Sequence, residues 1–497
     1  MSKEFKNNTI TLVPKLQFGN VLFGETAASQ CETWNEDKNL TPNPSPKRRG
    51  ETVPKISHNC HSLSSHEKET EGEVSNPSLN IGLFGFGCVG QGLYDVLNHS
   101  QGLKASIGKI CVKDKTKSRP ISLDFFTFDK HDVLAEEKHN LVVELTSDAE
   151  AALEIIGSSL VKGRSVVTAG KKVVAENFEL LYRLQQSGAS LLYEAACAGS
   201  IPIIRTLEEY YDNELLSSVR GILNGSSNYV LSRMEFEGIP YAEALRFAQA
   251  AGFAEADPTL DVDGTDAKYK LCLLAAHAFG IIIKPEYIFN SGIQNVTPFD
   301  INYASQIRSR IKLVAGISKS SAGTEGEERY RAYALPRFVS RENPLSNVNN
   351  EFNGIEVEGV YSDKQFFAGK GAGSHPTGSA VLSDISAITY NYKYGYKKLK
   401  KRKDQVSEVF GINSKAESVE RAAKDFSQDH RLLESDFEIR LYIRYKDKTD
   451  LDLLDIGRID EEHTSSINNG RYIIAQVGFS SLFNLRKSPN DLFVCEV

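Results

Sequence analysis

The sequence lacks several features that would assign it to a specialised class of protein. Among 497 residues there are one Trp and two Met, and no apolar run reaches the length of a membrane-spanning helix. The seven Cys stand singly, with no C-x-x-C pair, which argues against a disulfide framework and indicates a reducing compartment. No signal-peptide core is found near the N-terminus, so we expect a cytoplasmic location. The formal net charge of −7 does not favour nucleic acid or an acidic membrane as a partner.

Residues 1–79 differ in composition from the rest of the chain. Stretches such as LTPNPSPKRRGE are rich in Pro, Ser and charge, and they bury too little apolar surface to offset the entropy of ordering. We therefore expect a disordered insertion in front of the first strand. His58, Cys60, His61 and His66 lie close together, but they complete no zinc-type spacing, so a polar tail is favoured over a metal site.

A glycine-rich stretch follows directly after this segment. A short apolar run over 80–84 is typical of a buried parallel strand, and apolar residues at helical spacing over 89–97 indicate a helix. Between them, Gly85, Gly87 and Gly90 have the spacing G-x-G-x-x-G. In this strand–turn–helix context the pattern predicts a pyrophosphate site at a helix N-terminus, with an ordinary glycine turn as the alternative.

Strands and helices alternate from residue 80 onward, which predicts a doubly wound parallel α/β sheet over 80–205, joined by a returning helix near 374–392. The expected strands are 80–84, 107–113, 141–145, 165–168 and 190–193, and the expected helices are 149–161 and 176–186.

The pattern then changes to an α+β domain over 206–373, expected to bind the substrate and to form a dimer. It is expected to contain helices 201–211 and 239–251 and strands 217–224 and 330–339. A lysine-rich bridge at 392–404 precedes a small C-terminal α+β module over 405–497, with expected strands 436–445 and 471–479.

Three further stretches carry chemistry. In EAACAGSIP (194–202), Cys197 has no neighbour that would lower a thiol pKa, so a small buried residue is favoured over a nucleophile. GILNGSSNY (221–229) suits a turn that offers hydroxyls and amides to a polar ligand, or a plain Asn-Gly turn.

In GFAEADPTLDVDGTDAKYK (252–270), Asp266 and Lys270 are i,i+4 at the start of an apolar helix, where a half-buried pair can form. A partly desolvated lysine among carboxylates is a credible proton donor. A solvated acidic loop is the alternative, and the spacing does not fit an EF-hand.

Four motifs in this order resemble homoserine dehydrogenase over about 80–390. They are the glycine loop, the turn Asn224-Gly-Ser-Ser-Asn228, the acidic stretch ending in Lys270, and GKGAGSHPT at 369–377. The resemblance implies reversible NAD(P)H-dependent reduction of L-aspartate 4-semialdehyde to L-homoserine, a step towards threonine, methionine and isoleucine. It implies a monofunctional enzyme, a homodimer or higher homo-oligomer, in which residues 7–79 are an insertion.

The resemblance also implies roles for individual residues. Lys270 matches the proton donor to the carbonyl oxygen, and Lys171 matches a second lysine between cofactor and substrate. Asp261 resembles a contact of the substrate hydroxyl or of Lys270, and Asp266 resembles the group that orients that lysine. Glu255 resembles the ligand of the substrate ammonium. The contacts on the carboxylate side are Gly225 and Ser226.

The same resemblance implies binding positions for the cofactor and for a monovalent cation, expected to be sodium. The cofactor positions are Gly85, Gly87, Cys88, Val89, Gly90, Lys113, Thr146, Lys171 and Gly371. The cation would be held by main-chain carbonyls of Glu194, Cys197, Gly199 and Ile201.

The choice between NADP and NAD depends on the end of the second strand. Lys113, Lys115 and Lys117 favour NADP, because cations suit a 2′-phosphate, whereas Asp114 is the argument for NAD.

The chain departs from the family pattern at Gly170, where Asn is usual, and at Gly378, where Ala is common. Neither change removes a catalytic group. The alternatives are a related dehydrogenase of another amino-acid aldehyde, an aspartate semialdehyde dehydrogenase using Cys197 as nucleophile, and a catalytically silent regulatory homologue.

Overall fold

The computed structural model describes residues 78–213, 215–320, 328–400, 429–464, 471–487 and 492–497. The expectations for residues 1–77 of the N-terminal insertion, including its histidine cluster, and for residues 401–404 of the lysine-rich bridge lie outside these ranges.

The first part of the chain forms a six-stranded sheet in the order β3-β2-β1-β4-β5-β6, in which all neighbouring strands are parallel. Its apolar runs are buried on both faces, so that Ile81, Val142 and Val167 are 0% exposed. The doubly wound sheet predicted from the sequence is confirmed, although the two-residue strand β3 was not predicted. The strands are β1 Leu79–Phe84, β2 Ala105–Cys111, β3 Phe126–Thr127, β4 Leu141–Glu144, β5 Ser165–Thr168 and β6 Leu191–Leu192.

Helices cover this sheet, and the last of them returns from far along the chain. They are α1 Cys88–His99, α2 Lys130–Leu134, α3 Ala149–Val161, α4 Lys171–Glu176, α5 Phe178–Gln185 and α13 Ser374–Thr389. The helix predicted over 176–186 begins at Phe178, because Asn177 ends α4 and its side-chain amide donates to the carbonyl of Val173 at 3.0 Å.

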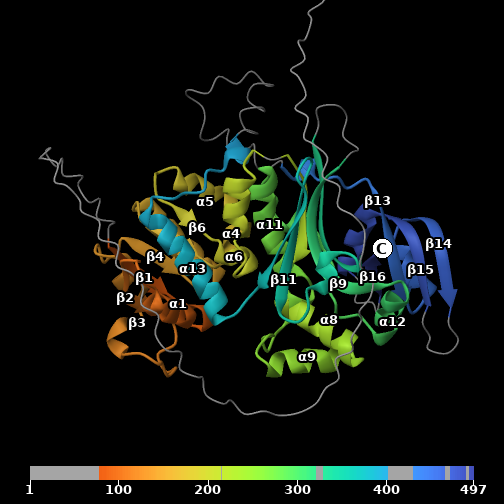
Figure 1. The fold of residues 1–497 in the computed structure, drawn as a ribbon, viewed down its shortest axis with the longest axis horizontal. Coiled ribbons are helices and arrows are strands. Elements are labelled where there is room, and N and C mark those ends of the chain that lie inside the picture. The colour runs from red at the N-terminus through yellow and green to blue at the C-terminus, as the bar shows by residue number, and fades with distance from the viewer. Residues whose placement is uncertain (1–77, 214, 321–327, 401–428, 465–470, 488–491) are drawn as a thin grey trace, which may run out of the picture. The chain divides into compact units, whose positions relative to one another are not determined.

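Helices α13 and α1 lie side by side at two glycines (Figure 1). A Cβ at Gly92 would lie 2.1 Å from the carbonyl oxygen of Ser374, and one at Gly378 would lie 2.7 Å from the carbonyl carbon of Gly92. The glycine at 378 is therefore explained by close helix packing.

The second part is a mixed sheet with strand order β12-β11-β7-β9-β10-β16-β13-β15-β14, and β8 pairs with β10 beside this path. The strands predicted over 217–224 and 330–339 correspond to β7 and β10, whereas β9, β11 and β12 were not predicted. The bounds are β7 Leu216–Ile222, β8 Phe289–Asn290, β9 Ser309–Ser320, β10 Arg329–Ser340, β11 Phe352–Gly359, β12 Asp363–Lys370, β13 Glu438–Tyr445, β14 Ile456–Thr464, β15 Arg471–Gly478 and β16 Phe493–Glu496.

The helices of this part include α11, which is buried along most of its length. The α-helices are α6 Ala195–Ala198, α7 Ile203–Arg205, α8 Gly225–Glu237, α9 Tyr241–Ala250, α10 Thr259–Val262, α11 Thr265–Phe279 and α12 Pro298–Gln306. Short 3₁₀ turns are Leu123–Phe125, Pro285–Tyr287, Pro344–Asn347, Asp429–Leu432, Lys448–Leu453 and Phe479–Lys487, and Thr206–Tyr210 is a π-helical turn. The single helix predicted over 201–211 is therefore divided into α7 and this π-helical turn.

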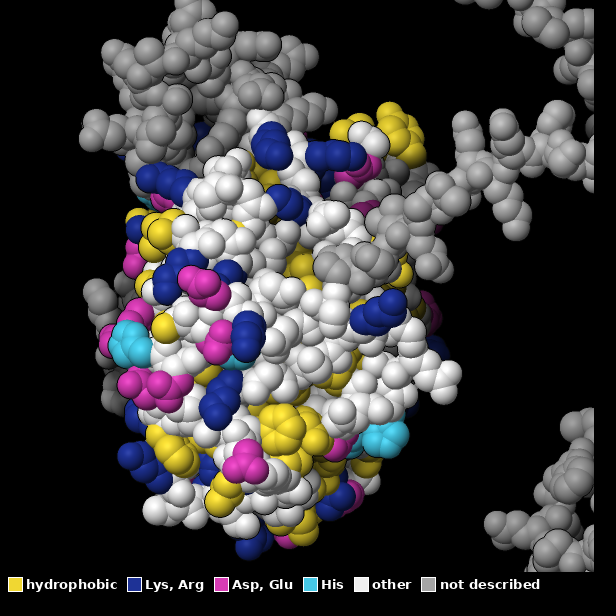
Figure 2. Space-filling view, turned by 90° about the vertical axis from the view of Figure 1, so that its left-hand side faces the viewer, with side chains coloured by type: hydrophobic (Ala, Val, Ile, Leu, Met, Phe, Trp, Pro, Cys, Tyr) yellow, Lys and Arg dark blue, Asp and Glu magenta, His cyan; other side chains and the backbone are white. Residues whose placement is uncertain are grey.

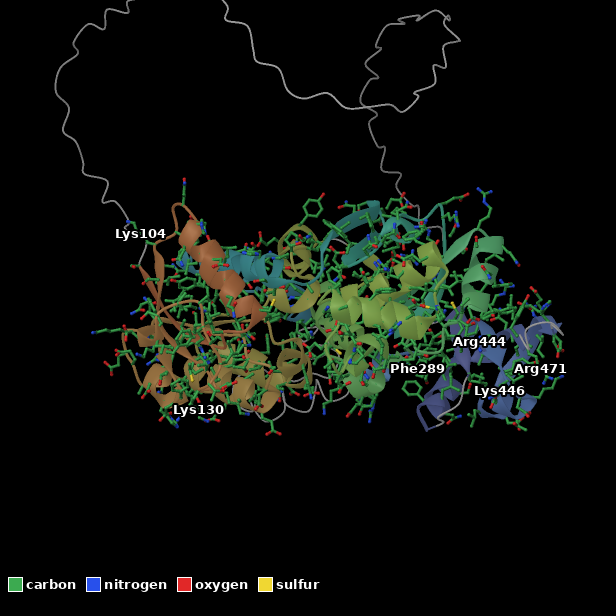
Figure 3. All side chains as sticks on the ribbon, turned by 90° about the horizontal axis from the view of Figure 1, so that it is seen from below. Lys104, Lys130, Phe289, Arg444, Lys446 and Arg471 are labelled. Carbon is green, nitrogen blue, oxygen red and sulfur yellow. The ribbon has the colours of Figure 1, made fainter. Side chains whose placement is uncertain are left out.

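The C-terminal strands β13 to β16 continue the mixed sheet, because β16 pairs with β10 at Arg337 and Glu496. Figure 3 shows Phe289 near the place where the C-terminal strands join the rest of the mixed sheet, and Arg444 on the C-terminal strands. Phe289 is 1% exposed and packs on the ring of Phe483 at 5.4 Å, and Arg444 contacts Asp300 at 3.0 Å. The proposed division into domains 80–205, 206–373 and 405–497 stays a prediction.

One apolar cluster unites the two sheets. It includes Leu83 and Val143 from the parallel sheet, Leu274 from α11 and Ile355 from β11. In the described ranges, no helix combines the length and the apolar character needed to cross a lipid bilayer.

Candidate functional site

The glycine loop forms a tight turn that leaves one glycine open. Gly85 has φ +90°, and a Cβ there would lie 2.5 Å from the carbonyl oxygen of Leu145, while one at Gly90 would lie 2.6 Å from that of Gly85. At Gly87 a Cβ would meet nothing within 4 Å. Gly87 is also the N-cap of α1 and supplies no side-chain hydrogen bond to it. The first amides of α1 are therefore free of a side-chain cap, as a pyrophosphate site requires.

The end of β2 carries the cations predicted to select the cofactor. Lys113 is exposed and lies 3.8 Å from Asp148. The Asp114 carboxylate accepts hydrogen bonds from the amide of Thr116 at 2.7 Å and from its hydroxyl at 2.8 Å, and these bonds lower the pKa of Asp114. Arg119 donates to the carbonyl oxygen of Asp114 at 2.5 Å. Asp114 is thus engaged within its own turn.

Thr146 does not present a free hydroxyl, because it is bonded to a buried carboxylate that sequence reasoning missed. Its hydroxyl and amide donate to Glu144 at 2.7 and 2.6 Å, and Thr168 donates to the other carboxylate oxygen at 2.6 Å. Burial raises the pKa of Glu144. The signal was a charged residue at the end of an apolar strand, in the run LVVE.

Two lysines from different parts of the chain meet on one carboxylate. Lys171 Nζ, at the start of α4, lies 2.7 Å from Oδ1 of Asp266, and Lys270 Nζ lies 2.8 Å from its Oδ2. Asp266 and Lys270 are 2% and 7% exposed, whereas the Lys171 side chain is 43% exposed. The predicted i,i+4 pair is therefore present in α11, and Lys171 joins it from the parallel sheet.

The charges in this cluster influence one another's protonation. Although burial opposes ionisation of Asp266, the ammonium groups of Lys171 and Lys270 hold its pKa well below the usual range. The charge of Asp266 in turn raises the pKa of Lys171 against the effect of burial. Burial, together with the charge of Asp266, raises the pKa of Asp261. The cluster therefore keeps Asp266 ionised and Lys171 protonated at neutral pH.

The turn after β7 contributes to the same cluster. Asn224 Nδ2 donates to Asp261 at 2.8 Å and to Asp266 at 2.9 Å, while its Oδ1 accepts from the amide of Ser227 as the N-cap of α8. Lys270 Nζ donates to the carbonyl oxygen of Leu223 at 2.6 Å. Asn224 belongs to the turn motif over 224–228, but the sequence alone does not predict its contacts with the two carboxylates.

The residues predicted to contact the substrate lie near this cluster. Gly225 has no room for a Cβ, which would lie 2.5 Å from the carbonyl oxygen of Glu351. Ser226 donates its hydroxyl to the carbonyl of Phe253 at 2.5 Å. Glu255 is exposed, and its charge contributes to the raised pKa of Lys171.

The turn over 194–201 is buried except at Ser200, and it is built around two carboxylates. The Glu194 carboxylate accepts from the amides of Ile204 and Arg205 at 2.8 Å each, and its amide donates to Asp384 at 2.9 Å. Cys197 is 0% exposed, and burial raises the pKa of its thiol far above the usual range. A thiol in this state is not a nucleophile, which disfavours the aspartate semialdehyde dehydrogenase alternative.

The late glycine motif packs against this turn. A Cβ at Gly199, where φ is +61°, would lie 2.5 Å from the carbonyl of Gly371. The amide and hydroxyl of Ser200 both donate to the carbonyl of Lys370 at 3.0 Å. The predicted cation turn and the predicted cofactor residue Gly371 are therefore neighbours.

This geometry defines a class of enzyme. A parallel sheet with an open glycine turn stands beside a mixed sheet whose buried helix brings two lysines onto one aspartate. The class is an NAD(P)-dependent oxidoreductase that acts on a CH–OH group. Figure 2, which views the molecule from the side of the parallel sheet, shows Lys and Arg side chains interspersed with Asp and Glu.

Comparison with known proteins identifies the family. Residues 85–194 match the homoserine dehydrogenase NAD-binding domain, and residues 202–386 match the homoserine dehydrogenase family model. The homoserine dehydrogenase of Synechocystis sp. is 38% identical over 319 residues, which are 63% of this chain and 73% of that protein. The chain belongs to the homoserine dehydrogenase family, and its activity is that of a homoserine dehydrogenase.

Other relatives and solved structures agree. The Bacillus subtilis homoserine dehydrogenase is 35% identical over 64% of this chain and 74% of its own length. The crystal structure of the Thiobacillus denitrificans homoserine dehydrogenase has a TM-score of 0.67 at 25% identity and covers 84% of this chain and 97% of that one. A hyperthermophilic archaeal homoserine dehydrogenase in complex with NADPH has a TM-score of 0.54 at 26% identity, covering 64% of this chain and 99% of that one.

Proposed function

We propose that Lys270 delivers the proton and Lys171 assists when this enzyme reduces L-aspartate 4-semialdehyde to L-homoserine. The observation that carries the proposal is the pair of contacts, 2.7 and 2.8 Å, that the two ammonium groups make with Asp266. An ammonium group close to a carbonyl oxygen stabilises the negative charge that develops there during reduction. When bound, the nicotinamide cofactor supplies the hydride or accepts it.

The residues of this chain would hold a substrate that carries one cation and one anion. Glu255 is exposed and negatively charged, as a ligand of the substrate ammonium must be. The amide of Gly225 and the side chain of Ser226 lie at the start of α8, where a carboxylate is favoured. Asp261, bonded to Asn224, would contact the substrate hydroxyl or Lys270.

The proton would leave from Lys270, which is held between two acceptors. Its Nζ contacts Asp266 and the carbonyl of Leu223, so its direction is fixed before the reaction begins. Lys171 is more exposed and joins the cluster from the parallel sheet, which suits a group placed between cofactor and substrate.

The glycine loop fits a dinucleotide, and the end of β2 favours NADP. Gly87 leaves space where a pyrophosphate would approach, and the loop continues through Cys88 and Val89 into α1. Lys113 is an exposed cation that would contact a 2′-phosphate. Asp114 is engaged by Thr116, so it is poorly placed to bind the ribose hydroxyls of NAD.

A monovalent cation, expected to be sodium, would be held by the carbonyls of Glu194, Cys197, Gly199 and Ile201. The chemistry of the donor set fits, because the Cys197 thiol stays protonated and the proposed ligands are neutral oxygens, which suit a hard cation. Such an ion would supply positive charge beside the turn that carries Gly371.

A homodimer or higher homo-oligomer remains part of the proposal. Strand β12 is one of the two edge strands of the described mixed sheet, and Phe366 on it and Phe352 on the neighbouring β11 are each 38% exposed. An open edge with apolar side chains favours pairing with a second copy. The five cysteines in the described ranges are free, which supports a cytoplasmic location.

Two variants test the roles of the residues. Lys270→Ala should lower kcat by about 10²–10⁴-fold and leave cofactor affinity unchanged, because it removes a proton donor that acts in the transition state. Glu255→Gln should mainly raise the KM for homoserine, because it removes a charge that pairs with the ammonium in both states.

The two variants are compared by steady-state kinetics, with cofactor binding followed by fluorescence. A Lys270→Ala enzyme with near-normal kcat would move the proton donor elsewhere, most simply to Lys171.

A further inference from the structure

Asn353, on β11, shares an acceptor with the proposed proton donor. It is 1% exposed, and its Nδ2 donates to the carbonyl oxygen of Leu223 at 3.1 Å, the same oxygen that accepts from Lys270 at 2.6 Å. We propose that Asn353 is a positioning residue for proton transfer, which fixes the Leu223 carbonyl and through it Lys270. This inference rests on the proposed role of Lys270.

The oxygen of the same side-chain amide lacks the hydrogen bond that a buried acceptor normally has. Oδ1 of Asn353 is buried and has no hydrogen-bond partner among the residues that the structure describes. A buried acceptor without a partner is unfavourable, so stability alone does not explain an amide at this position. The group that this position supplies is a donor directed at the Leu223 carbonyl, and an apolar residue of similar size lacks it.

Asn353 also lies against the late glycine motif. A Cβ at Gly371 would lie 2.1 Å from Cγ and from Nδ2 of Asn353, so only glycine leaves room for the amide. Gly371 in turn packs on Gly199 of the 194–201 turn. Asn353 therefore contacts both the Leu223 carbonyl that anchors Lys270 and Gly371, which is proposed to bind the cofactor, and it connects the two parts of the site.

The backbone that presents Asn353 is itself held firmly. The side-chain amide of Asn228, on α8, donates to the carbonyls of Val348, Asn350 and Phe352 at 3.1, 3.0 and 3.1 Å. These bonds fix the segment that leads into β11, so Asn353 enters the site in a defined position. Small displacements of a catalytic group reduce rate steeply, which is why such support matters.

The test uses Asn353→Ala and Asn353→Asp in the full-length enzyme with homoserine and cofactor. Asn353→Ala should lower kcat by about 10–100-fold while the cofactor Kd and the KM for homoserine change by less than about threefold, because only the placement of Lys270 is disturbed. Asn353→Asp puts a negative charge near Lys270. Because Lys270 must accept the proton when homoserine is oxidised, this charge should move the acidic limb of the kcat profile to higher pH.

A double-mutant cycle tests the contact with Gly371. Gly371→Ala should displace the Asn353 amide and lower kcat, whereas the Asn353→Ala variant has room for the added methyl group. The fold-reduction of kcat in the double variant should therefore be clearly smaller than the product of the fold-reductions in the two single variants. The control is Asn484→Ala, which should retain normal kcat. It also removes an asparagine that donates to a main-chain carbonyl, in this case that of Leu453.

The inference is overturned if Asn353→Ala keeps the kcat of the parent enzyme, if the pH profile of Asn353→Asp is unchanged, or if the two losses multiply fully. Failure of the proposed function has a different signature, because there Lys270→Ala itself would retain normal kcat.

Discussion

Asp266 is the residue around which the site is arranged. It is 2% exposed and would be unfavourable there without partners, and two ammonium groups and the amide of Asn224 supply them. Of these contacts, only the Asp266–Lys270 pair follows from spacing in the sequence, because it is i,i+4 in one helix. Lys171 and Asn224 reach Asp266 from distant segments, and local sequence patterns do not encode such contacts.

In the proposed function, the choice between NADP and NAD depends on single residues at the end of β2. Lys113→Glu should lower kcat/KM for NADP relative to NAD, because it replaces the exposed cation proposed to contact the 2′-phosphate. Asp114→Asn should leave the NADP/NAD ratio unchanged, because an amide oxygen can accept the same hydrogen bonds from Thr116. The ratio of kcat/KM values measured with both cofactors checks both statements. If Lys113→Glu left the ratio unaltered, the assignment of Lys113 would be wrong.

At the level of elements, strands and helices with a strong apolar pattern were predicted well. The parallel strands were predictable from apolar runs that are buried on both faces of the sheet. Helix α3 was predictable from apolar residues that are buried on one face of the helix. Strand β12 was missed because it is largely exposed and its sequence DKQFFAGK does not alternate between apolar and polar residues. Strand β11 does contain an alternating run, IEVE at 355–358, and this signal was missed. Asn353 could not be predicted as part of the site, because its position depends on the pairing of β11 with β7, which no local pattern encodes.

Strand β9 carries a lysine that gives stability a specific pH dependence. Lys312 is 1% exposed and donates to the carbonyl of Val348 at 2.6 Å and to Asn228 at 3.1 Å, and burial lowers its pKa to about 7. Between about pH 7 and 10, the unfolded chain keeps this proton while the folded chain has lost it. The free energy of unfolding should therefore rise with pH in this window, by up to about 1.4 kcal/mol per unit from this group.

The measurement is denaturant unfolding at several pH values, comparing the parent enzyme with Lys312→Met. The variant should lack this part of the rise, whereas Lys319→Met, near the other end of β9, should keep it, since Lys319 is paired with Glu328 at the surface. Parallel curves for the parent and Lys312→Met would show that Lys312 does not titrate in this range.

At the scale of the molecule, the proposed mechanism requires that two sheets meet. The parallel sheet contributes the glycine loop and Lys171, and the mixed sheet with α11 contributes Asp266 and Lys270. The return of α13 onto α1 and the packing of Gly371 on the 194–201 turn connect the two. The fold class was predictable because each sheet has its own apolar pattern, whereas the joining of the C-terminal strands to the mixed sheet was not, since β16 is four residues long.

The most direct test of the account is cofactor reduction by the intact chain on addition of L-homoserine at alkaline pH, where release of a proton favours oxidation. The account predicts homoserine-dependent reduction of NADP, with a lower kcat/KM for NAD, and no requirement for phosphate. Absence of reduction with either cofactor, or reduction that instead requires aspartate semialdehyde and phosphate, would contradict it.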